Sequence, residues 1–330
     1  MIDSLSPSDL SDAINKLKTN YVDPASLNDQ ELSRATLQGL VARLAPGAAI
    51  FAKAPEPPAP SPFHSEVLPG DIGYLRLGSL TKENLGKMDD EMKNFHDKDV
   101  KSIILDLRAT PDGDFDMAAQ VIERFAPKGK TLFTVKKPGA KDQRVVTSDT
   151  DPVVRAIVIV LVDGDTGGAG EVIAGALRIY TNAMIVGSNT PGRAVEYSDI
   201  PLSGGKILRV AVSEVVLSDG SAIFPKGIKP DVAVEMPRDV KTQVMQQSLE
   251  KGVGPFVFET ERPHFNEAAL VGRTNPDLDA AEAAQKERQA GGVHPAPPLR
   301  DTVLQHALDL ITSIAIYEGK PPDTVKPPQQ

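Results

Sequence analysis

The sequence of 330 residues contains neither cysteine nor tryptophan, and several classes of protein are excluded by what it lacks. Without cysteine it has no disulfide and no thiolate metal site, which leaves its compartment open. No stretch approaches the ~20 consecutive apolar residues of a membrane-spanning helix. The five histidines are scattered and show none of the spacings typical of zinc sites. We therefore expect no metal, no cofactor and no transmembrane segment.

Basic residues are also scarce. Asp and Glu number 45 against 36 Lys and Arg, the net charge is −9, and the longest basic run is the pair Lys136 and Lys137. Binding to a phosphate backbone requires clustered Lys and Arg, so we expect no nucleic-acid partner. The first residues have neither a basic start nor an apolar core, so no signal peptide is visible in this chain.

Hydrophobic residues make up 40% of the chain, enough for a substantial core, and their spacing divides the chain into segments. Apolar residues at helical spacing run through residues 8–45, interrupted at Asp23 and Pro24. Residues 52–70 are rich in proline and predict an extended linker. From Asp71 onward, short apolar runs alternate with amphipathic helical patterns. This alternation is typical of parallel β-α-β units and predicts the α/β class, with strands at residues 72–77, 100–107, 153–162, 183–187 and 207–216 and helices at 85–95, 117–125, 170–180 and 304–314.

The most informative segment is a glycine-rich turn between a strand pattern and a helix pattern. The β-branched run at residues 157–162 is followed by the turn from Asp163 to Gly168, and Glu171 opens the helix. Such a turn presents backbone N–H groups at a helix N-terminus, where an anion such as phosphate can bind. However, the phosphate-loop motif is absent, and Asp163 and Asp165 would repel phosphate. The alternative to anion binding is a purely structural interpretation, in which the tight turn needs glycine only for its backbone conformation.

Together with residues 190–194, this turn resembles that of peptidase family S41, the C-terminal-processing or tail-specific peptidases. In that family the turn reads G-S-A-S-A-S-E with the nucleophilic serine in the middle, and a later T-F-G-K-G supplies the lysine that acts as its general base. Aligned without gaps, Gly168 lies at the serine position, and Arg193, 25 positions later, lies at the lysine position. Glycine has no nucleophile, and arginine stays protonated, so it cannot act as the base. The resemblance therefore implies a peptidase scaffold without its Ser–Lys dyad.

Two further positions depart from the family pattern. The family's D-L-R-N-N-P-G-G corresponds to Asp106 onward, so that Pro111, Asp112 and Gly113 stand for P-G-G. A carboxylate at Asp112 would disfavour a developing oxyanion. Tyr197 falls on the family's glutamine, four positions after the lysine. Further matches are residues 220–231, similar to G-x-x-I-x-G-x-G-I-x-P-D, and residues 20–24 and 39–46, similar to the N-terminal helical segment of the family.

The resemblance implies the crotonase/ClpP-like β-α-β spiral core of S41 peptidases, with a helical subdomain formed by the N- and C-terminal segments. Many members carry a PDZ module after the first helices, but the linker in this chain is too short for one. The expected organisation is an N-terminal helical segment (1–51), a Pro-rich linker without PDZ (52–70), the peptidase-like core (71–236), an irregular and partly helical extension (237–296), and a C-terminal helix packing on the N-terminal helices with a Pro-rich tail (297–330).

For function, we expect a catalytically inactive homologue that acts as a peptide- or protein-binding or regulatory module, because active members hold a peptide as an added strand. One alternative is a serine-type endopeptidase with displaced catalytic groups, for instance Thr166 or Ser188. The other is a carrier of small lipophilic molecules, which an enclosed apolar cavity would favour over a narrow strand-lined groove. The family also implies an exported protein, periplasmic or extracellular. The candidate ligand-binding residues are Pro111, Asp112, Gly113, Gly167, Gly168, Ala169 and Arg193.

Arg193 carries a fixed charge over the vacated site and needs a carboxylate. We expect it either to pair with a nearby acidic residue and close the site, or to stay free for an anionic group such as a peptide C-terminus. The acidic candidates are Asp112, Asp163, Asp165 and Glu196.

Overall fold

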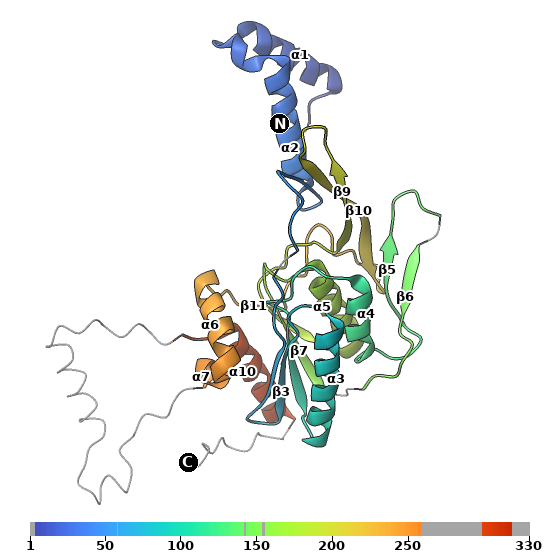
Figure 1. The fold of residues 1–330 in the computed structure, drawn as a ribbon, viewed down its shortest axis with the longest axis vertical. Coiled ribbons are helices and arrows are strands. Elements are labelled where there is room, and N and C mark those ends of the chain that lie inside the picture. Colours follow the sequence, from blue (N-terminus) through green and yellow to red (C-terminus); the bar gives the residue numbers. More distant parts are fainter. Residues whose placement is uncertain (1–3, 58, 142, 154–155, 259–298, 319–330) are drawn as a thin grey trace, which may run out of the picture.

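Two β-sheets and the helices around them form the body of the molecule (Figure 1). The computed structural model describes residues 4–57, 59–141, 143–153, 156–258 and 299–318. The larger sheet has six strands in the order β11-β8-β7-β4-β3-β2, all parallel to their neighbours except β2, which runs antiparallel to β3 at one edge. Its strands are β2 (His64–Leu68), β3 (Ile72–Arg76), β4 (Ser102–Asp106), β7 (Ile157–Val162), β8 (Met184–Gly187) and β11 (Val232–Ala233).

The central strands of this sheet are apolar at nearly every position because helices cover both of its faces. Successive side chains of β4 point to opposite faces, so Ile103 and Leu105 join one hydrophobic cluster while Ile104 joins the other. Helices α3, α4 and α5 cover the first face, and α7 and α10 cover the second. The helices of the body are α3 (Lys82–Asp97), α4 (Phe115–Glu123), α5 (Gly168–Thr181), α6 (Arg238–Lys251), α7 (Gly254–Val257) and α10 (Thr302–Tyr317).

The smaller sheet is antiparallel and is built around one long strand, β10 (Ile207–Leu217). β1 and β5 pair with successive parts of β10, β6 pairs with β5, and β9 pairs with β10. The sequence patterns predicted β10 and missed the other four strands. Those strands are short and some are partly exposed, and β1 and β5 pair with a strand far along the chain, so local patterns indicate them poorly. They are β1 (Ala48–Phe51), β5 (Thr131–Lys136), β6 (Arg144–Thr147) and β9 (Val195–Pro201).

The linker predicted at residues 52–70 needs a correction. Its last part forms β2, which is hydrogen-bonded to β3 as the edge strand of the larger sheet. The proline-rich residues before it and the weak alternation of its side chains concealed this strand in the sequence. The described residues from 52 to 63 form neither helix nor strand. β1 and β2 each join a sheet of the body, so the described residues between 46 and 72 form no separate compact domain.

The predicted packing of the last helix on the N-terminal helices is wrong. α10 lies against β7, β8 and α7, and its Leu304, Leu308 and Ile311 belong to the hydrophobic cluster on the second face of the larger sheet. The apolar side chains of α10 are therefore buried against this face of the sheet and not against another helix. The N-terminal helices α1 (Pro7–Asn20) and α2 (Asp29–Leu44) project from the opposite end of the body (Figure 1), and none of their residues is buried.

A buried charge network fastens α10 to the larger sheet. Arg108, which follows β4, is only 1% exposed, and its Nη2 donates to Oδ2 of Asp106 at 2.7 Å and to Oδ2 of Asp301 at 2.8 Å. Asp301 also caps α10 by accepting the N–H of Leu304, and the hydroxyl of Tyr74 donates to Asp106. Burial alone would raise the pKa of Asp106, but the guanidinium of Arg108 outweighs burial and holds that pKa below its usual value.

Several expectations fall on residues outside the described ranges. These are most of the extension, at residues 259–298, and the Pro-rich tail, at residues 319–330. Among the residues that the structure describes, no helix has the length and hydrophobicity required to cross a bilayer, and no three His, Asp or Glu side chains are grouped to hold a metal ion.

Candidate active site of a peptidase-like core

The glycine-rich turn joins the carboxyl end of β7 to the N-terminus of α5. Thr166, the hydroxyl residue inside the turn, is fully buried. Its Oγ1 donates to the carbonyl of Leu107 at 3.2 Å and accepts the N–H of Asp163 at 3.0 Å. A Cβ on Gly167 would lie 2.3 Å from the backbone nitrogen of Asp112. The turn therefore packs directly on the backbone at Asp112, and only glycine fits at position 167.

Gly168 lies at the position predicted for the missing nucleophile, and the space that a side chain would need there is filled. A Cβ on Gly168 would lie 2.2 Å from the carbonyl oxygen of Arg193 and 3.2 Å from the Cα of Ala194. A serine therefore does not fit on this backbone. The N–H of Gly168 donates to Oδ1 of Asp112 at 2.8 Å. A carboxylate of the chain itself thus occupies the N-terminus of α5, where an anion is stabilised by the helix dipole and the free N–H groups.

Arg193 lies over the same carboxylate. Its Nε is 3.6 Å from Oδ1 of Asp112, and the two side chains are 33% and 50% exposed. The expected pairing of Arg193 with a carboxylate is confirmed, and the structure identifies Asp112 as the partner. The other three acidic candidates have partners of their own, namely Lys241 for Asp163 and Asp165, and Arg144 for Glu196.

Lys241 of α6 holds the outer side of the turn. Its Nζ lies 2.6 Å from Oδ2 of Asp163 and 2.5 Å from Oδ2 of Asp165, and Arg238 adds a second contact to Asp165. Burial raises the pKa of Asp163 in spite of Lys241. Burial would also raise the pKa of Asp165, but Lys241 and Arg238 outweigh it, so that pKa is lowered. The two carboxylates beside the turn are therefore neutralised by α6 and are not available to Arg193.

Glu171 is the residue of this site that sequence reasoning missed. It lies in the first turn of α5 and is fully buried, and its carboxylate accepts the N–H of Gly192 and the N–H of Arg193, both at 2.6 Å, as well as the hydroxyl of Thr190. These bonds fix the backbone of residues 190–193 above Gly168. Burial raises the pKa of Glu171, and the three hydrogen bonds oppose that shift. The sequence shows Glu171 only as a helix opener, because its partners come 19 to 22 positions later.

A cavity of about 250 Å³ lies beside Gly168. Tyr197 lines it, and its hydroxyl donates to the carbonyl of Pro46 at 3.1 Å, while burial raises its pKa. Pro111 and Gly167 do not line the cavity but lie behind it, in the backbone contact described above. The predicted ligand-binding residues in the lining are Asp112, Gly113, Gly168, Ala169 and Arg193, and the structure adds Asp114, Phe115, Val195 and Glu196.

The two candidate displaced nucleophiles, Thr166 and Ser188, lie in different surroundings. The hydroxyl of Thr166 is committed to holding the turn. Ser188 follows β8 and does not line the cavity beside Gly168. In the described part of the chain, no side-chain base is hydrogen-bonded to either hydroxyl, as nucleophilic catalysis would require.

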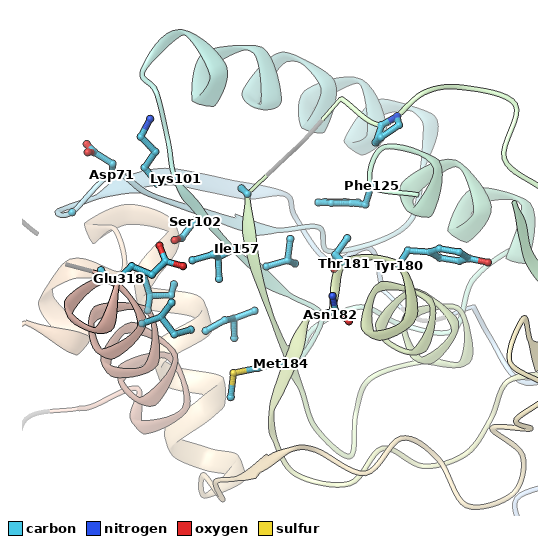
Figure 2. Close-up of a pocket in the computed structure, with 18 of the residues that line it drawn as sticks. Asp71, Lys101, Ser102, Phe125, Ile157, Tyr180, Thr181, Asn182, Met184 and Glu318 are labelled. Carbon is cyan, nitrogen blue, oxygen red and sulfur yellow. The ribbon is translucent and has the colours of Figure 1, made fainter. Parts of the chain in front are cut away.

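A larger cavity of about 1350 Å³ lies at the other end of β7, where the strand begins (Figure 2). Ile157 and Met184 contribute apolar surface to it, and Asp71, Lys101 and Glu318 contribute charged groups. Gly168 follows the opposite end of the same strand, so this cavity is separate from the one beside Gly168. The mixed lining differs from the enclosed apolar cavity expected of a lipophilic-ligand carrier.

Comparison with known proteins shows which protein family this chain resembles. Residues 71–234 match the model of peptidase family S41. A probable CtpA-like serine protease of Staphylococcus aureus is 30% identical over 188 residues, which cover 56% of this chain and 38% of that protein. A carboxy-terminal-processing protease of Bartonella bacilliformis is 30% identical over 265 residues, which cover 78% of this chain and 56% of that protein. The chain thus spans less than two thirds of the length of these relatives.

Among solved structures, a candidate peptidase of Parabacteroides merdae has a similar fold. The two superpose with a TM-score of 0.53 at 17% sequence identity, over 73% of this chain and 85% of that one. At this identity the likeness concerns the fold alone, and it agrees with the α/β architecture predicted from the sequence.

Proposed function

Because the chain belongs to peptidase family S41, we propose that it is a catalytically inactive member that binds a peptide at the site where the catalytic groups are missing. The observation that carries this proposal is the hydrogen bond from the N–H of Gly168 to Asp112, with Arg193 beside it. An active Ser–Lys site needs a hydroxyl, a neutral base and an open oxyanion position. Here Gly168 supplies no hydroxyl, and the permanent cation of Arg193 replaces the base. The backbone N–H of Gly168 is already hydrogen-bonded to the carboxylate of Asp112.

The free edge of β9 supports peptide binding. Among the described residues, β9 pairs only with β10, so the backbone groups along its other edge have no strand partner. The first three residues of β9, Val195, Glu196 and Tyr197, line the cavity beside Gly168. An extended peptide can add to such an edge through main-chain hydrogen bonds, with side chains entering adjacent pockets. The mode needs no catalytic group.

The Asp112–Gly168–Arg193 arrangement also indicates which end of a peptide would bind. Asp112 places a carboxylate against a backbone N–H at a helix N-terminus and next to a guanidinium. A peptide's C-terminal carboxylate has the same chemistry and would replace that of Asp112. Both side chains of the pair are partly exposed, so the pair is weak and its opening costs only about 0–1 kcal/mol. We extend the proposal accordingly to peptides with a free C-terminus.

The absence of catalysis is tested with purified protein, unfolded casein and a fluorophosphonate probe. We expect no cleavage above background and no covalent labelling, because neither Gly168 nor Arg193 can supply the missing chemistry. Saturable turnover, or stoichiometric labelling at Thr166, Ser188 or any other hydroxyl, would establish the alternative of displaced catalytic groups and contradict the proposal.

Peptide binding is tested by fluorescence anisotropy with a labelled decapeptide that ends in three apolar residues, compared with its C-terminal amide. The amide should bind at least about tenfold more weakly, since it lacks the charge that Arg193 recognises. Asp112→Asn should tighten binding of the free acid by removing its competitor. Asp114→Asn is the matched control, because Asp114 lines the same cavity but bonds neither Gly168 nor Arg193. Equal binding of acid and amide, or an equal effect of the two variants, would show that the carboxylate site is not used.

The exported location expected from the family stays part of this proposal. Fractionation of the native host, with a cytoplasmic marker as control, should place the protein outside the cytoplasm.

A further inference from the structure

The cavity of about 1350 Å³ at the start of β7 takes no part in the peptide binding proposed above. It lies where β4, β7 and β8 begin, at the end of the sheet opposite to Gly168. Figure 2 shows Ser102, Ile157, Met184 and Glu318 between β7 and α10. Ordinary small-molecule sites have volumes of roughly 300–1,000 Å³, so this cavity has room for an elongated ligand.

The floor of the cavity is apolar. It is formed by the second face of the larger sheet and by the last turns of α10, and two of its members belong to the hydrophobic cluster between them. The other three are only half-buried. An alkyl chain that covered them would be stabilised by the removal of this surface from water. The buried members are Ile159 and Ile311, and the half-buried ones are Ile157, Met184 and Ile314.

A buried hydroxyl lines the same cavity and has no partner. Ser102, the first residue of β4, is only 3% exposed, and within the described structure its Oγ makes no hydrogen bond. It lies on the same face of the sheet as Ile104, which is the face covered by α10. Buried side-chain hydroxyls nearly always have a hydrogen-bond partner. The hydroxyl of Ser102 is therefore suited to a polar group of a ligand.

The charged groups around the cavity favour a cation. Within the described lining Lys101 is the one base, and its ammonium already pairs with Asp99. Neither Asp71 nor Asp151 forms an ion pair with another described residue, and both are exposed. Asp71 directly precedes the residue of β3 that is in register with Ser102. An excess of carboxylates attracts cations and repels anions. The carboxylates in the lining are those of Asp71, Asp151 and Glu318.

From these observations we propose that this cavity is a binding site for an amphiphilic primary amine. The ammonium group lies near Ser102 and Asp71, and the alkyl chain covers the apolar floor. An ammonium has three N–H donors and no acceptor, so it can bond the Oγ of Ser102 and a carboxylate together. A fatty acid or a phospholipid is less suitable, because its anionic group would face the carboxylates of the lining. This site is separate from the peptide site, so each proposal can fail without the other.

Calorimetric titration of the full chain with decylammonium, below its critical micelle concentration, tests the binding. We expect saturable binding at one site. Butylammonium should bind at least about tenfold more weakly because its chain is short, and decanoate because its charge is opposite. Ala315→Trp, which fills the cavity from α10, should abolish binding. Ile316→Trp is its control, since Ile316 is 60% exposed and does not line the cavity.

Two further variants test the polar end of the site. Ser102→Ala should weaken decylammonium binding at least about threefold. It should leave decyltrimethylammonium unaffected, because that ion has no N–H to donate. Asp71→Asn should weaken both ligands, and asparagine tolerates the positive φ of 54° at this position. Asp90→Asn, exposed on α3, is the matched control for the loss of one negative charge. Circular dichroism melts establish that each variant is folded.

Several outcomes would overturn the proposal. These are a lack of saturable binding, equal affinities for decylammonium and decanoate, and equal effects of Asp71→Asn and Asp90→Asn. Binding of an amphipathic peptide of leucine and lysine, without binding of decylammonium, would also refute it and would assign the cavity to a protein partner.

Discussion

At residue 168 two separate facts exclude a nucleophile. The first is the identity of the residue, which has no side chain. The second is a lack of space, because a Cβ on this residue would lie only 2.2 Å from the carbonyl oxygen of Arg193. Glu171 holds that carbonyl in place through the N–H groups of Gly192 and Arg193. Replacing Gly168 by serine would therefore add a hydroxyl only if the loop at residues 190–193 moved.

The closure above Gly168 predicts an effect on stability. Gly168→Ala should lower the free energy of unfolding by about 1–3 kcal/mol, because the new methyl group overlaps backbone atoms that cannot rotate away. Urea unfolding followed by circular dichroism measures this. Gly164→Ala is the control in the same turn, since a Cβ there meets nothing within 4 Å, and it should change stability by no more than about 0.5 kcal/mol. A Gly168→Ala protein as stable as the wild type would show that the loop is not held as described.

At the scale of elements, Glu171 connects α5 with the loop that follows β8. One buried carboxylate satisfies two backbone N–H groups and the hydroxyl of Thr190, and Oγ1 of Thr190 in turn accepts the N–H of Ile228 at 2.7 Å. The helix, the loop carrying Arg193 and the segment at residue 228 are thus joined through two side chains, Glu171 and Thr190. The position of Arg193 beside Gly168 follows from these links.

The raised pKa of Glu171 predicts a pH dependence. Since burial raises the pKa in the folded state, the contribution of this group to stability is fully present below the usual glutamate value of about 4.3 and is lost as the pH rises through the folded-state pKa. The free energy of unfolding of the wild type should therefore fall relative to that of Glu171→Gln as the pH rises above about 4. Urea titrations at several pH values measure this difference.

Glu250→Gln provides the comparison, because Glu250 is exposed on α6. It reports the effect of removing a glutamate charge at an exposed position. A pH-independent difference for Glu171→Gln would mean that Glu171 titrates as it does in the unfolded chain, and that its burial has no energetic consequence.

At the scale of the whole molecule, the buried network around Arg108 joins parts of the chain that lie far apart in sequence. It connects Tyr74 of β3 and Asp106 of β4 with Asp301 at the start of α10. A buried ion pair adds little stability by itself, but removing one partner leaves an uncompensated charge. The attachment of α10 to the second face of the sheet therefore depends on these four side chains as well as on apolar packing.

Asp106→Asn should lower the free energy of unfolding by about 3–5 kcal/mol at neutral pH. The pKa of Asp106 is lowered in the folded state, so the stability from its charge is present above the usual aspartate value of about 3.9 and is lost as the pH falls through the folded-state pKa. The difference between wild type and Asp106→Asn should therefore shrink on acidification. Urea unfolding at neutral and acidic pH measures it, with the exposed Asp90→Asn as control. A difference that persists undiminished in acid would contradict the charged state assigned to Asp106.

The four inner strands of the larger sheet, β3, β4, β7 and β8, could be predicted from the sequence because both of their faces are buried. Burial on two faces requires a continuous apolar run, as in β4 and β7, and such a run is visible without knowledge of the fold. β1, β2, β5, β6 and β9 lack such a run, since each has positions that are exposed or only partly buried. The same limit explains the error about α10, whose apolar stripe is plain in the sequence although its partner is not.

What the sequence determined by itself was the identity of the two residues aligned with the family's dyad. Gly168 has no side chain and Arg193 keeps its charge, and no fold can change either fact. Only the tertiary structure decided which groups surround these two residues. The carboxylate that meets the N–H of Gly168 comes from 56 positions earlier in the chain, and the carboxylate that holds the backbone of Arg193 comes from 22 positions earlier. The pairing of such groups depends on how distant segments pack, because it is the folded backbone that sets their distance.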